Sequence, residues 1–341
     1  MANVSSPAMA AAVSKAGALG SLGVGATDAE GARKMIAELR TLTDHPFNVN
    51  LFCHAPAKPN AAVEAAWLAR LSPDFEAYDA KSPTKIAQSY RTFLDDDAML
   101  TMLIEVKPAV VSFHFGLPSA EKIESLQNAG IFLMATATCL NEARVIASAG
   151  IDAIVAQGFE AGGHRGMFDP DAHDDQLGTM ALTRLLARDF DLPIIAAGGM
   201  MDGSGIAAAL ALGAGAAQLG TAFIGCHESL ADVGYRNALF SDAAHHTEMT
   251  RAISGRPARC LANRFTALGE KIASSEIPSY PIAYDAGKAL NSAAKAKGEF
   301  GYGAHWSGQG APLARVLPAG DLVLTLEDEM NRALGSTRAK G

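Results

Sequence analysis

The sequence is poor in charged and aromatic residues. Charged residues make up 19% and aromatic residues 6% of the 341 positions, whereas hydrophobic residues make up 49%. A chain this apolar is not disordered, and its length allows a large core. Lys and Arg together number 28 against 36 Asp and Glu, and the net charge of −8 argues against a broad surface for nucleic acid or anionic membranes. These numbers leave a soluble globular protein rich in small residues.

Targeting signals are weak. The N-terminus lacks the basic segment of a secretory signal; its Ala-rich start resembles one slightly, but a helix capped by Ser6 with Pro7 in its first turn explains it better. The uncharged stretch 203–226 is long enough to cross a bilayer, yet its Gly and Ala content favours a buried helix followed by a buried strand. The cysteines form no CxxC pair, which predicts free thiols in a reducing cytoplasm; they are Cys53, Cys139, Cys226 and Cys260.

Several common motifs are absent. No GxGxxG or GxxxxGK[ST] follows an expected strand and no GxSxG occurs, so a Rossmann site, a P-loop and a hydrolase triad are not supported. One acidic loop resembles a metal site but lacks the Gly and distal Glu of a calcium loop, so we favour a solvated loop and expect no metal. Its residues are Asp169, Asp171, His173, Asp174 and Asp175.

Short apolar runs alternate with helical patterns along the chain. Runs that do not alternate in polarity are typical of parallel strands buried on both faces, and strand–helix alternation predicts βαβ units. We therefore predict a (β/α)8 TIM barrel, with a doubly wound open sheet as the alternative. The expected strands are Leu19–Ala26, Phe47–Cys53, Ala109–Gly116, Ile131–Thr138, Ala153–Gly158, Pro193–Gly199 and Ala216–Phe223.

These are seven strands where a closed barrel needs eight. We expect the first barrel strand to be the missing one, either because the chain is truncated at its N-terminus or because the sheet closes differently. We expect one domain over 1–341. It carries an insertion at 54–108, after the third barrel strand, with helical stretches at Ala61–Leu71 and Thr84–Thr92. A C-terminal extension, 227–341, is expected to be irregular over Ser274–Pro318 and to end in a helix near Leu324–Leu334. Insertion and extension should cover the active site.

Barrel enzymes work at the C-terminal ends of their strands, and the last two strands usually bind phosphate through backbone N–H groups. Gly198 and Gly199 end one of these strands in our sequence. The next strand carries Gln218, Leu219, Gly220 and Thr221, whose hydroxyl is a further donor. We predict a phosphate-binding site here; tight turns with close packing are the alternative.

Two histidines follow strand ends. His164 lies in a glycine-rich turn after Gln157, in Gln157–Gly166, where a general base would be well placed; an inert loop histidine is the alternative. His114 taken alone reads better as a hydrogen-bonded core residue. Asn50 is an amide inside an apolar strand, and the edge of a heterocycle is one candidate partner for it.

The C-terminal extension adds polar aromatic residues. Tyr280, Tyr284 and Lys288 are spaced by four and would share one helical face, either of a plain amphipathic helix or beside a small anionic ligand. The segment Trp306–Gly310 is too polar and too rich in Gly for a core, and it suits a loop that touches a ligand.

Together these blocks resemble the nitronate monooxygenase family, formerly called 2-nitropropane dioxygenases. The most specific block is AIVAQGFEAGGHRG at Ala153–Gly166; PIIAAGGM, AAQLGTAF, FNVNLF and SFHFGLP occur in the family's order. SFHFG together with the Tyr280, Tyr284 and Lys288 series resembles the bacterial class I enzymes. The resemblance covers essentially the whole chain.

This resemblance implies a TIM barrel that binds FMN and oxidises alkyl nitronates, such as propionate 3-nitronate, with O2 to a carbonyl compound and nitrite. His164 would be the catalytic base, and a charged His164 or Lys288 would favour an anionic substrate. The FMN residues would be Asn50, Gln157, Gly162, Gly163, Gly198, Gly199, Gln218, Leu219, Gly220 and Thr221. The substrate pocket would be lined by His114, Tyr90, Tyr280, Tyr284 and Lys288.

The resemblance leaves other functions open. An FMN-dependent NADH:quinone or enoyl-thioester reductase shares the fold, a cofactor-free isomerase would share the phosphate site, and a non-catalytic flavin-binding protein would show no turnover. The resemblance implies a first strand whose end helps cover the flavin, and we expect a misassigned or truncated start to account for its not being seen in this sequence. We expect a cytoplasmic monomer or homodimer acting on small molecules.

Overall fold

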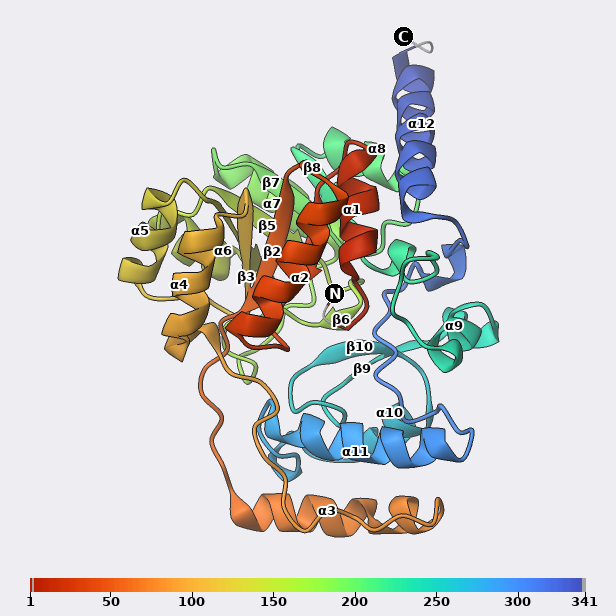
Figure 1. The fold of residues 1–341 in the computed structure, drawn as a ribbon. Helices are drawn as coiled ribbons and strands as arrows, with labels where there is room; N and C mark the ends of the chain where they lie inside the picture. The colour runs from red at the N-terminus through yellow and green to blue at the C-terminus, as the bar shows by residue number, and fades with distance from the viewer. Residues whose placement is uncertain (2, 339–341) are drawn as a thin grey trace.

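A curled sheet of seven parallel strands forms the centre of the protein in a computed structural model that describes residue 1 and residues 3–338 (Figure 1). The strands pair in the order β1-β2-β3-β4-β5-β7-β8. Each neighbouring pair is in parallel register, for example Asn50 with Ser112 and Gln157 with Ala197. The bounds are β1 Gly20–Gly23, β2 Phe47–Phe52, β3 Val110–His114, β4 Phe132–Ala137, β5 Ala153–Gln157, β7 Ile194–Ala197 and β8 Ala216–Gln218.

This strand order decides between the two predicted folds. The seven strands of this sheet lie side by side in the order in which they occur in the chain, as in a barrel. A doubly wound sheet would instead reverse its strand order at a switch point. The fold is therefore TIM-barrel-like, as predicted. Helices on the outer face cover it: α2 Ala29–Leu42, α4 Asp97–Val106, α5 Ala120–Asn128, α6 Leu140–Ser148, α7 Thr179–Asp189 and α8 Gly203–Ala211.

The edges of the sheet are β1 and β8, which do not pair with each other in the described part of the chain. Helix α1 (Pro7–Lys15) packs against β1, so closely that a Cβ on Gly20 would lie 2.0 Å from the Ala10 carbonyl oxygen. Ser6 caps α1 and Pro7 opens it, as predicted. Its apolar face shares a core cluster with α12 (Ala319–Arg338).

A second body, which we call the cap, lies against the C-terminal ends of the strands (Figure 1). Its core joins α3 (Ala61–Glu76) of the insertion to α11 (Ile282–Ala296) of the extension through Trp67, Leu71, Phe265 and Leu290. A three-stranded antiparallel sheet, β6-β10-β9, forms the side of the cap nearest the barrel (Figure 1). Its bounds are β6 Gly163–His164, β9 Thr247–Thr250 and β10 Ala258–Leu261. Helices α9 Val233–Leu239 and α10 Arg264–Gly269 complete the cap. Short 3-10 turns along the chain are η1 Phe93–Asp95, η2 Thr221–Phe223, η3 Asp242–His245, η4 Ser274–Glu276 and η5 Ala311–Leu313.

Two predictions for this body were wrong. The segment Thr84–Thr92 is not helical: it has no regular secondary structure, and the Asp285 carboxylate accepts from the Ala87 N–H. The segment Ser274–Pro318 is not irregular, because α11 occupies its middle with an apolar face buried against α3. No described helix is both long enough and apolar enough to span a membrane.

Candidate active site

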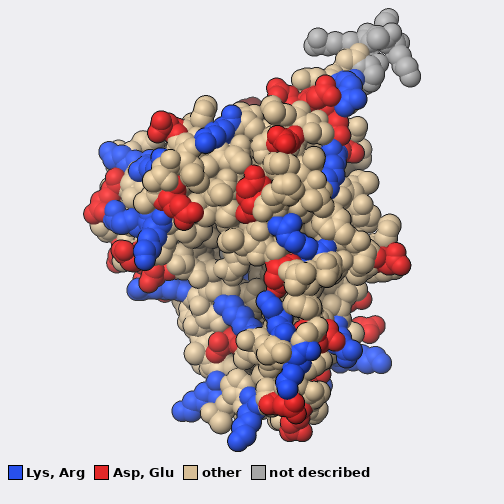
Figure 2. All heavy atoms as spheres, turned by 45° about the vertical axis from the view of Figure 1, so that its right-hand side comes forward, with Lys and Arg blue, Asp and Glu red and all other residues tan. Residues whose placement is uncertain are grey.

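A cavity of about 300 Å³ opens between the ends of the barrel strands and the cap, in the size range of small-molecule sites. Charged side chains of both signs are spread around a central hollow, so no single-sign patch surrounds it (Figure 2). Residues from distant parts of the chain line the cavity. Those predicted from the sequence are Asn50, Tyr90, His114, Gln157, Gly162, Gly163, His164, Gly198, Gly199, Gln218, Leu219, Gly220, Thr221, Tyr280 and Tyr284.

Amides and hydroxyls of the first strands form the barrel side of the wall. Ser112 Oγ accepts from the side-chain N–H groups of Asn48, at 2.9 Å, and of Asn50, at 2.8 Å. Asn48 Nδ2 also lies 2.8 Å from Ser21 Oγ, but its Oδ1 is buried with no partner among the described residues. Buried polar atoms are normally paired, so this oxygen and the neighbouring Asn50 suit a ligand with polar edges.

Gln157 and His114 hold the main chain at His164. Gln157 Nε2 and His114 Nε2 lie 3.0 and 3.2 Å from the His164 carbonyl oxygen, and Gln157 Oε1 accepts from the Gly166 N–H at 2.7 Å. A carbonyl only accepts, so His114 carries its proton on Nε2 and its Nδ1 accepts from Thr136, 3.1 Å away. Burial lowers the His114 pKa to about 4 and keeps the ring neutral.

The two glycine segments at β7 and β8 meet at one end of the cavity. Gly198 and Gly199 have φ of +125° and +72°, which other residues rarely adopt. A Cβ on Gly198 would lie 2.7 Å from Thr179 Oγ1, so close packing, the alternative predicted above, also applies here. The N–H groups of Gly199, Gly220 and Thr221 donate no hydrogen bond within the described residues, which leaves them free for an anion.

The cap supplies an aromatic wall. Around His164, ring centroids lie at 5.3 Å for Tyr280, 6.3 Å for Tyr284 and 5.0 Å for Trp306. Trp306 Nε1 donates to the Tyr284 hydroxyl at 3.3 Å. Trp306, Gly308 and Gly310 all line the cavity, in agreement with the prediction for Trp306–Gly310.

Lys288 stands behind this wall. Its Nζ lies 4.1 Å from the Tyr90 ring centroid and 5.0 Å from that of Tyr284, both cation–π distances, and the residue does not itself line the cavity. Burial lowers its pKa. The structure therefore places Lys288 behind the rings of Tyr90 and Tyr284 and not in the cavity lining that the sequence predicted for it.

His164 lies on β6, the short strand that links the barrel to the cap sheet. Its Nε2 lies 2.8 Å from Ser254 Oγ. Burial lowers its pKa well below the usual value, and the neighbouring His114, Arg256 and His54 act in the same direction. The ring is therefore neutral at physiological pH, in contrast to the charged form considered from the sequence.

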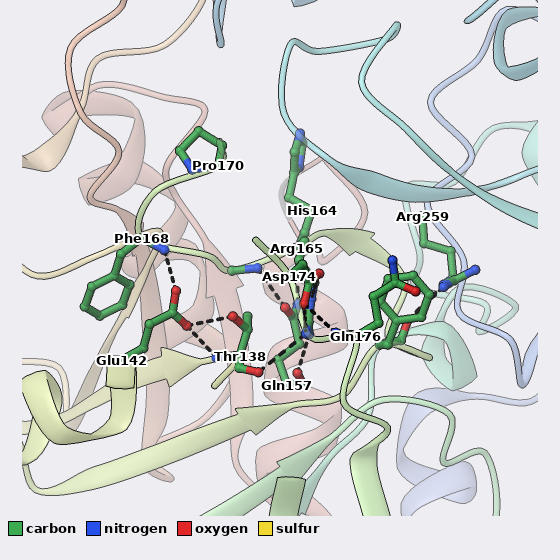
Figure 3. Close-up of polar contacts among 12 residues, drawn as sticks. Thr138, Glu142, Gln157, His164, Arg165, Phe168, Pro170, Asp174, Gln176 and Arg259 are labelled. Carbon is green, nitrogen blue, oxygen red and sulfur yellow. Dashed lines mark hydrogen bonds and ion pairs between the residues drawn. The ribbon is translucent and has the colours of Figure 1, made fainter. Parts of the chain in front are cut away.

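The strand puts Arg165 on the opposite side from His164 (Figure 3). Arg165 is buried and pairs with Asp174 through Nε–Oδ2 at 2.8 Å and Nη2–Oδ1 at 2.9 Å, and it donates to the Gln157 carbonyl. Glu142 accepts from the Phe168 N–H at 2.8 Å. These contacts give the acidic loop a structural role, since Asp171 likewise pairs with Arg251. Among the described residues no cluster of His, Cys, Asp and Glu could hold a metal.

The residues present fit a flavin nucleotide. The free N–H groups at β7 and β8 suit a phosphate, and the polar atoms of Asn48 and Asn50 suit the edge of a heterocycle.

The sequence did not predict three residues of this site, which are Ser254, Arg256 and Tyr235. Tyr235 lines the cavity and donates to the Trp306 carbonyl at 2.6 Å; no motif marks any of the three.

The comparison with protein families bears on this site. The family model described as nitronate monooxygenase matches residues 1–329. This chain belongs to the nitronate monooxygenase family. The family consists of flavin-dependent oxidoreductases, and the chain is an enzyme of that class.

Relatives match over nearly the full length. A nitronate monooxygenase of Paraburkholderia phytofirmans is 64% identical over 99% of this chain and 92% of its own, and one of Pseudomonas aeruginosa is 50% identical over 97% and 94%. A solved nitroalkane oxidase from Streptomyces ansochromogenes is 39% identical with a TM-score of 0.90, over 98% and 94%. FabK from Thermotoga maritima is 30% identical with a TM-score of 0.73, over 99% and 93%.

Proposed function

We propose that this enzyme oxidises alkyl nitronates of the propionate 3-nitronate type with O2, using FMN, to a carbonyl compound and nitrite. The observation that carries the proposal is a neutral histidine, His164, held in a cavity between a polar barrel wall and an aromatic cap wall. The family and the named activities of its relatives support it.

The barrel side would hold FMN. We place the phosphate at Gly198, Gly199, Gly220 and Thr221, where backbone N–H groups are free. Asn50, Gln157 and the backbone at Gly162, Gly163, Gln218 and Leu219 would contact the rest of the cofactor. When bound, the flavin supplies the electron-transfer chemistry, and the protein supplies position and electrostatics.

The cap side would hold the nitronate. Tyr280, Tyr284 and Trp306 enclose the space beside His164, while His114 narrows it from the barrel and Tyr90 from the insertion. The ammonium group of Lys288 lies behind Tyr90 and Tyr284, and it favours an anion over a neutral molecule by a modest amount, because its charge acts at a distance.

A neutral His164 suits proton abstraction from a neutral nitroalkane. The imidazole takes the proton from the carbon next to the nitro group, and the resulting imidazolium faces the nitronate anion that it has formed. A nitronate supplied as the anion needs no such step. The four free cysteines agree with a reducing cytoplasm, which is where we place the enzyme.

The first test is a spectrum and a product assay. The purified protein is titrated with FMN, and the appearance of bound-flavin absorbance gives the stoichiometry. Nitrite is then measured under air with propionate 3-nitronate. One bound FMN per chain and nitrite formation in proportion to enzyme are expected; a protein that binds FMN but forms no nitrite would contradict the proposal.

The FabK likeness makes a reductase the second candidate. It predicts rapid anaerobic reduction of the flavin by NADH. The structure favours the nitronate enzyme because aromatic rings close the cap side of the cavity around His164.

A further inference from the structure

Ser254 is a buried serine in direct contact with His164. It lies in the turn between β9 and β10, has 0% exposure, and places its Oγ 2.8 Å from His164 Nε2. The antiparallel pairing of β10 with β6 brings this turn next to His164, because Ala258 of β10 is in register with His164 of β6.

The turn around Ser254 is held firmly. Gly255 has φ +94°, and a Cβ on it would lie 2.6 Å from the Pro278 carbonyl oxygen and 2.6 Å from the Tyr280 nitrogen. The guanidinium of Arg256 stacks on Phe115, 4.3 Å from the ring centroid, and donates to the Met167 carbonyl. Ser254 therefore has little freedom to choose another partner.

Hydrogen-bond chemistry assigns the protons. Ser254 Oγ lies 3.3 Å from the Arg256 carbonyl oxygen, which can only accept, and 3.4 Å from the Arg256 nitrogen, which can only donate. With the serine proton directed at that carbonyl, Oγ accepts from His164 Nε2–H. Nδ1 then keeps its lone pair, because the contact of Nε2 with Ser254 is the hydrogen bond that the His164 ring makes among the described residues.

The reverse assignment would disable the base. If the Ser254 hydroxyl donated to His164 Nε2, the neutral ring would carry its proton on Nδ1, and neither nitrogen would have a free lone pair. The direction of one hydrogen bond therefore decides whether His164 can accept a proton.

We propose that Ser254 is a positioning residue that holds His164 in its Nε2–H tautomer, so that Nδ1 accepts the proton of a neutral nitroalkane. The inference rests on the proposed function. In this step the C–H bond breaks, an N–H bond forms at Nδ1, and the C–H electron pair becomes part of the nitronate C=N bond. The imidazolium keeps the hydrogen bond from Nε2–H to Ser254 Oγ. The Ser254 hydroxyl in turn donates to the Arg256 carbonyl oxygen, and this carbonyl helps to stabilise the positive charge.

The groups that face His164 make this contact important. They are His114 from β3, His54 from the segment after β2, Arg256 from the turn, Tyr280 and Tyr284 from the cap, and Trp306 from the loop before α12. Within the described chain no carboxylate bonds to His164. Serine and a backbone carbonyl thus take the position that a carboxylate holds in Ser-His-Asp triads.

The experiment compares two substrates that differ by one proton. Turnover is measured with neutral nitroethane and with preformed ethylnitronate, for FMN-loaded wild type, Ser254→Ala and Ser254→Thr. Ser241→Ala, an exposed serine elsewhere in the cap, is the matched control. The pH profile and the isotope effect of dideuterated nitroethane are recorded for each.

We expect Ser254→Ala to lower kcat/KM for nitroethane by about 10- to 100-fold, with a larger isotope effect, and to leave ethylnitronate within about threefold. Ser254→Thr should recover most of the loss. Equal losses on both substrates, or no loss on nitroethane, would overturn the inference. Wild-type protein inactive on ethylnitronate would instead overturn the proposed function, and the inference with it.

A second measurement does not depend on the variants folding. The ¹⁵N chemical shifts of His164 in the wild-type holoenzyme, assigned with His164→Gln, distinguish the two neutral tautomers. A protonated Nε2 supports the inference, and a protonated Nδ1 contradicts it.

Discussion

The barrel and the cap build the two sides of one cavity by different means. The barrel wall consists of backbone N–H groups, glycines and side-chain amides at the ends of parallel strands. The cap wall consists of aromatic rings from segments far apart in the chain, with one cation behind them. Strand ends are fixed by the sheet ladder and suit a cofactor that every family member shares, whereas loops and added helices can vary with the substrate.

His164 stands where the two sides meet. Its strand, β6, pairs with β10 of the cap, but its carbonyl is held by Gln157 and His114 of the barrel. The comparison therefore predicts that substitutions in the barrel wall change cofactor binding and that substitutions in the cap wall change substrate binding. A substitution of His164 should change the rate of the chemical step.

The largest effect is expected at His164. His164→Ala should lower kcat/KM for neutral nitroethane by about 10²- to 10⁴-fold, because the base is lost, while FMN stays bound. Steady-state rates and the flavin spectrum check this. His173→Ala removes an exposed histidine and is the control. Wild-type rates in His164→Ala, or loss of the flavin, would break the assignment.

The barrel side is probed at Gly220. Its φ of −116° accommodates any residue, and an added Cβ would lie 3.4 Å from Met1 Sδ at the cavity wall. Gly220→Val should raise the Kd for FMN by at least about tenfold, since its side chain takes up phosphate space. Gly215→Val, outside the cavity lining, should leave the Kd unchanged. Fluorescence titration with FMN distinguishes them, and similar Kd values would contradict the placement.

The cap side is probed at Lys288. Lys288→Met keeps the aliphatic stem and removes the charge, so KM for propionate 3-nitronate should rise by about three- to tenfold, equivalent to roughly 1 kcal/mol. FMN affinity should not change. Lys297→Met, where an exposed lysine just after the same helix pairs with Asp79, is the control. A changed FMN affinity with an unchanged KM would contradict the assignment of substrate binding to the cap side and cofactor binding to the barrel side.

The smallest effect is on stability, and it follows from the buried histidines. Burial lowers the pKa of His54, His114 and His305 to about 4 and that of His164 well below its usual value. The unfolded chain therefore binds more protons below about pH 6.5, and stability present above that pH is lost as the pH falls toward 4, by at most about 1.4 kcal/mol per unit for each group.

Thermal unfolding at constant ionic strength tests this. Tm should fall between pH 7 and pH 5, and His54→Phe, which keeps a ring against Tyr280, should reduce the slope. His173→Ala should not. A Tm independent of pH in this range would show that folding does not lower the pKa of these histidines.

The sequence predicted the barrel well because its signals are local. Most of the parallel strands are short, buried apolar runs, and several of the following helices begin at a recognisable cap, as at Asp28, Ser119 and Asp202. Helices α6 and α7 begin without a side-chain cap. The strand ends then bring the predicted cofactor residues to one cavity.

The cap was predicted poorly because its contacts are long-range. Helix α11 lacks a side-chain cap at its N-terminus and is stabilised by α3, about 200 positions earlier in the chain. Ser254 shows no motif; only the pairing of β10 with β6 brings it to His164. Tyr284 and Lys288 were found because the spacing of four places them on one face of α11.

Anaerobic mixing of the FMN-loaded enzyme tests the central claim most directly. In separate experiments, flavin absorbance is followed after addition of ethylnitronate and after addition of NADH, without O2. A nitronate enzyme should show rapid loss of the absorbance of oxidised flavin with ethylnitronate and little change with NADH. Rapid reduction by NADH with no response to ethylnitronate would contradict the claim and identify a reductase.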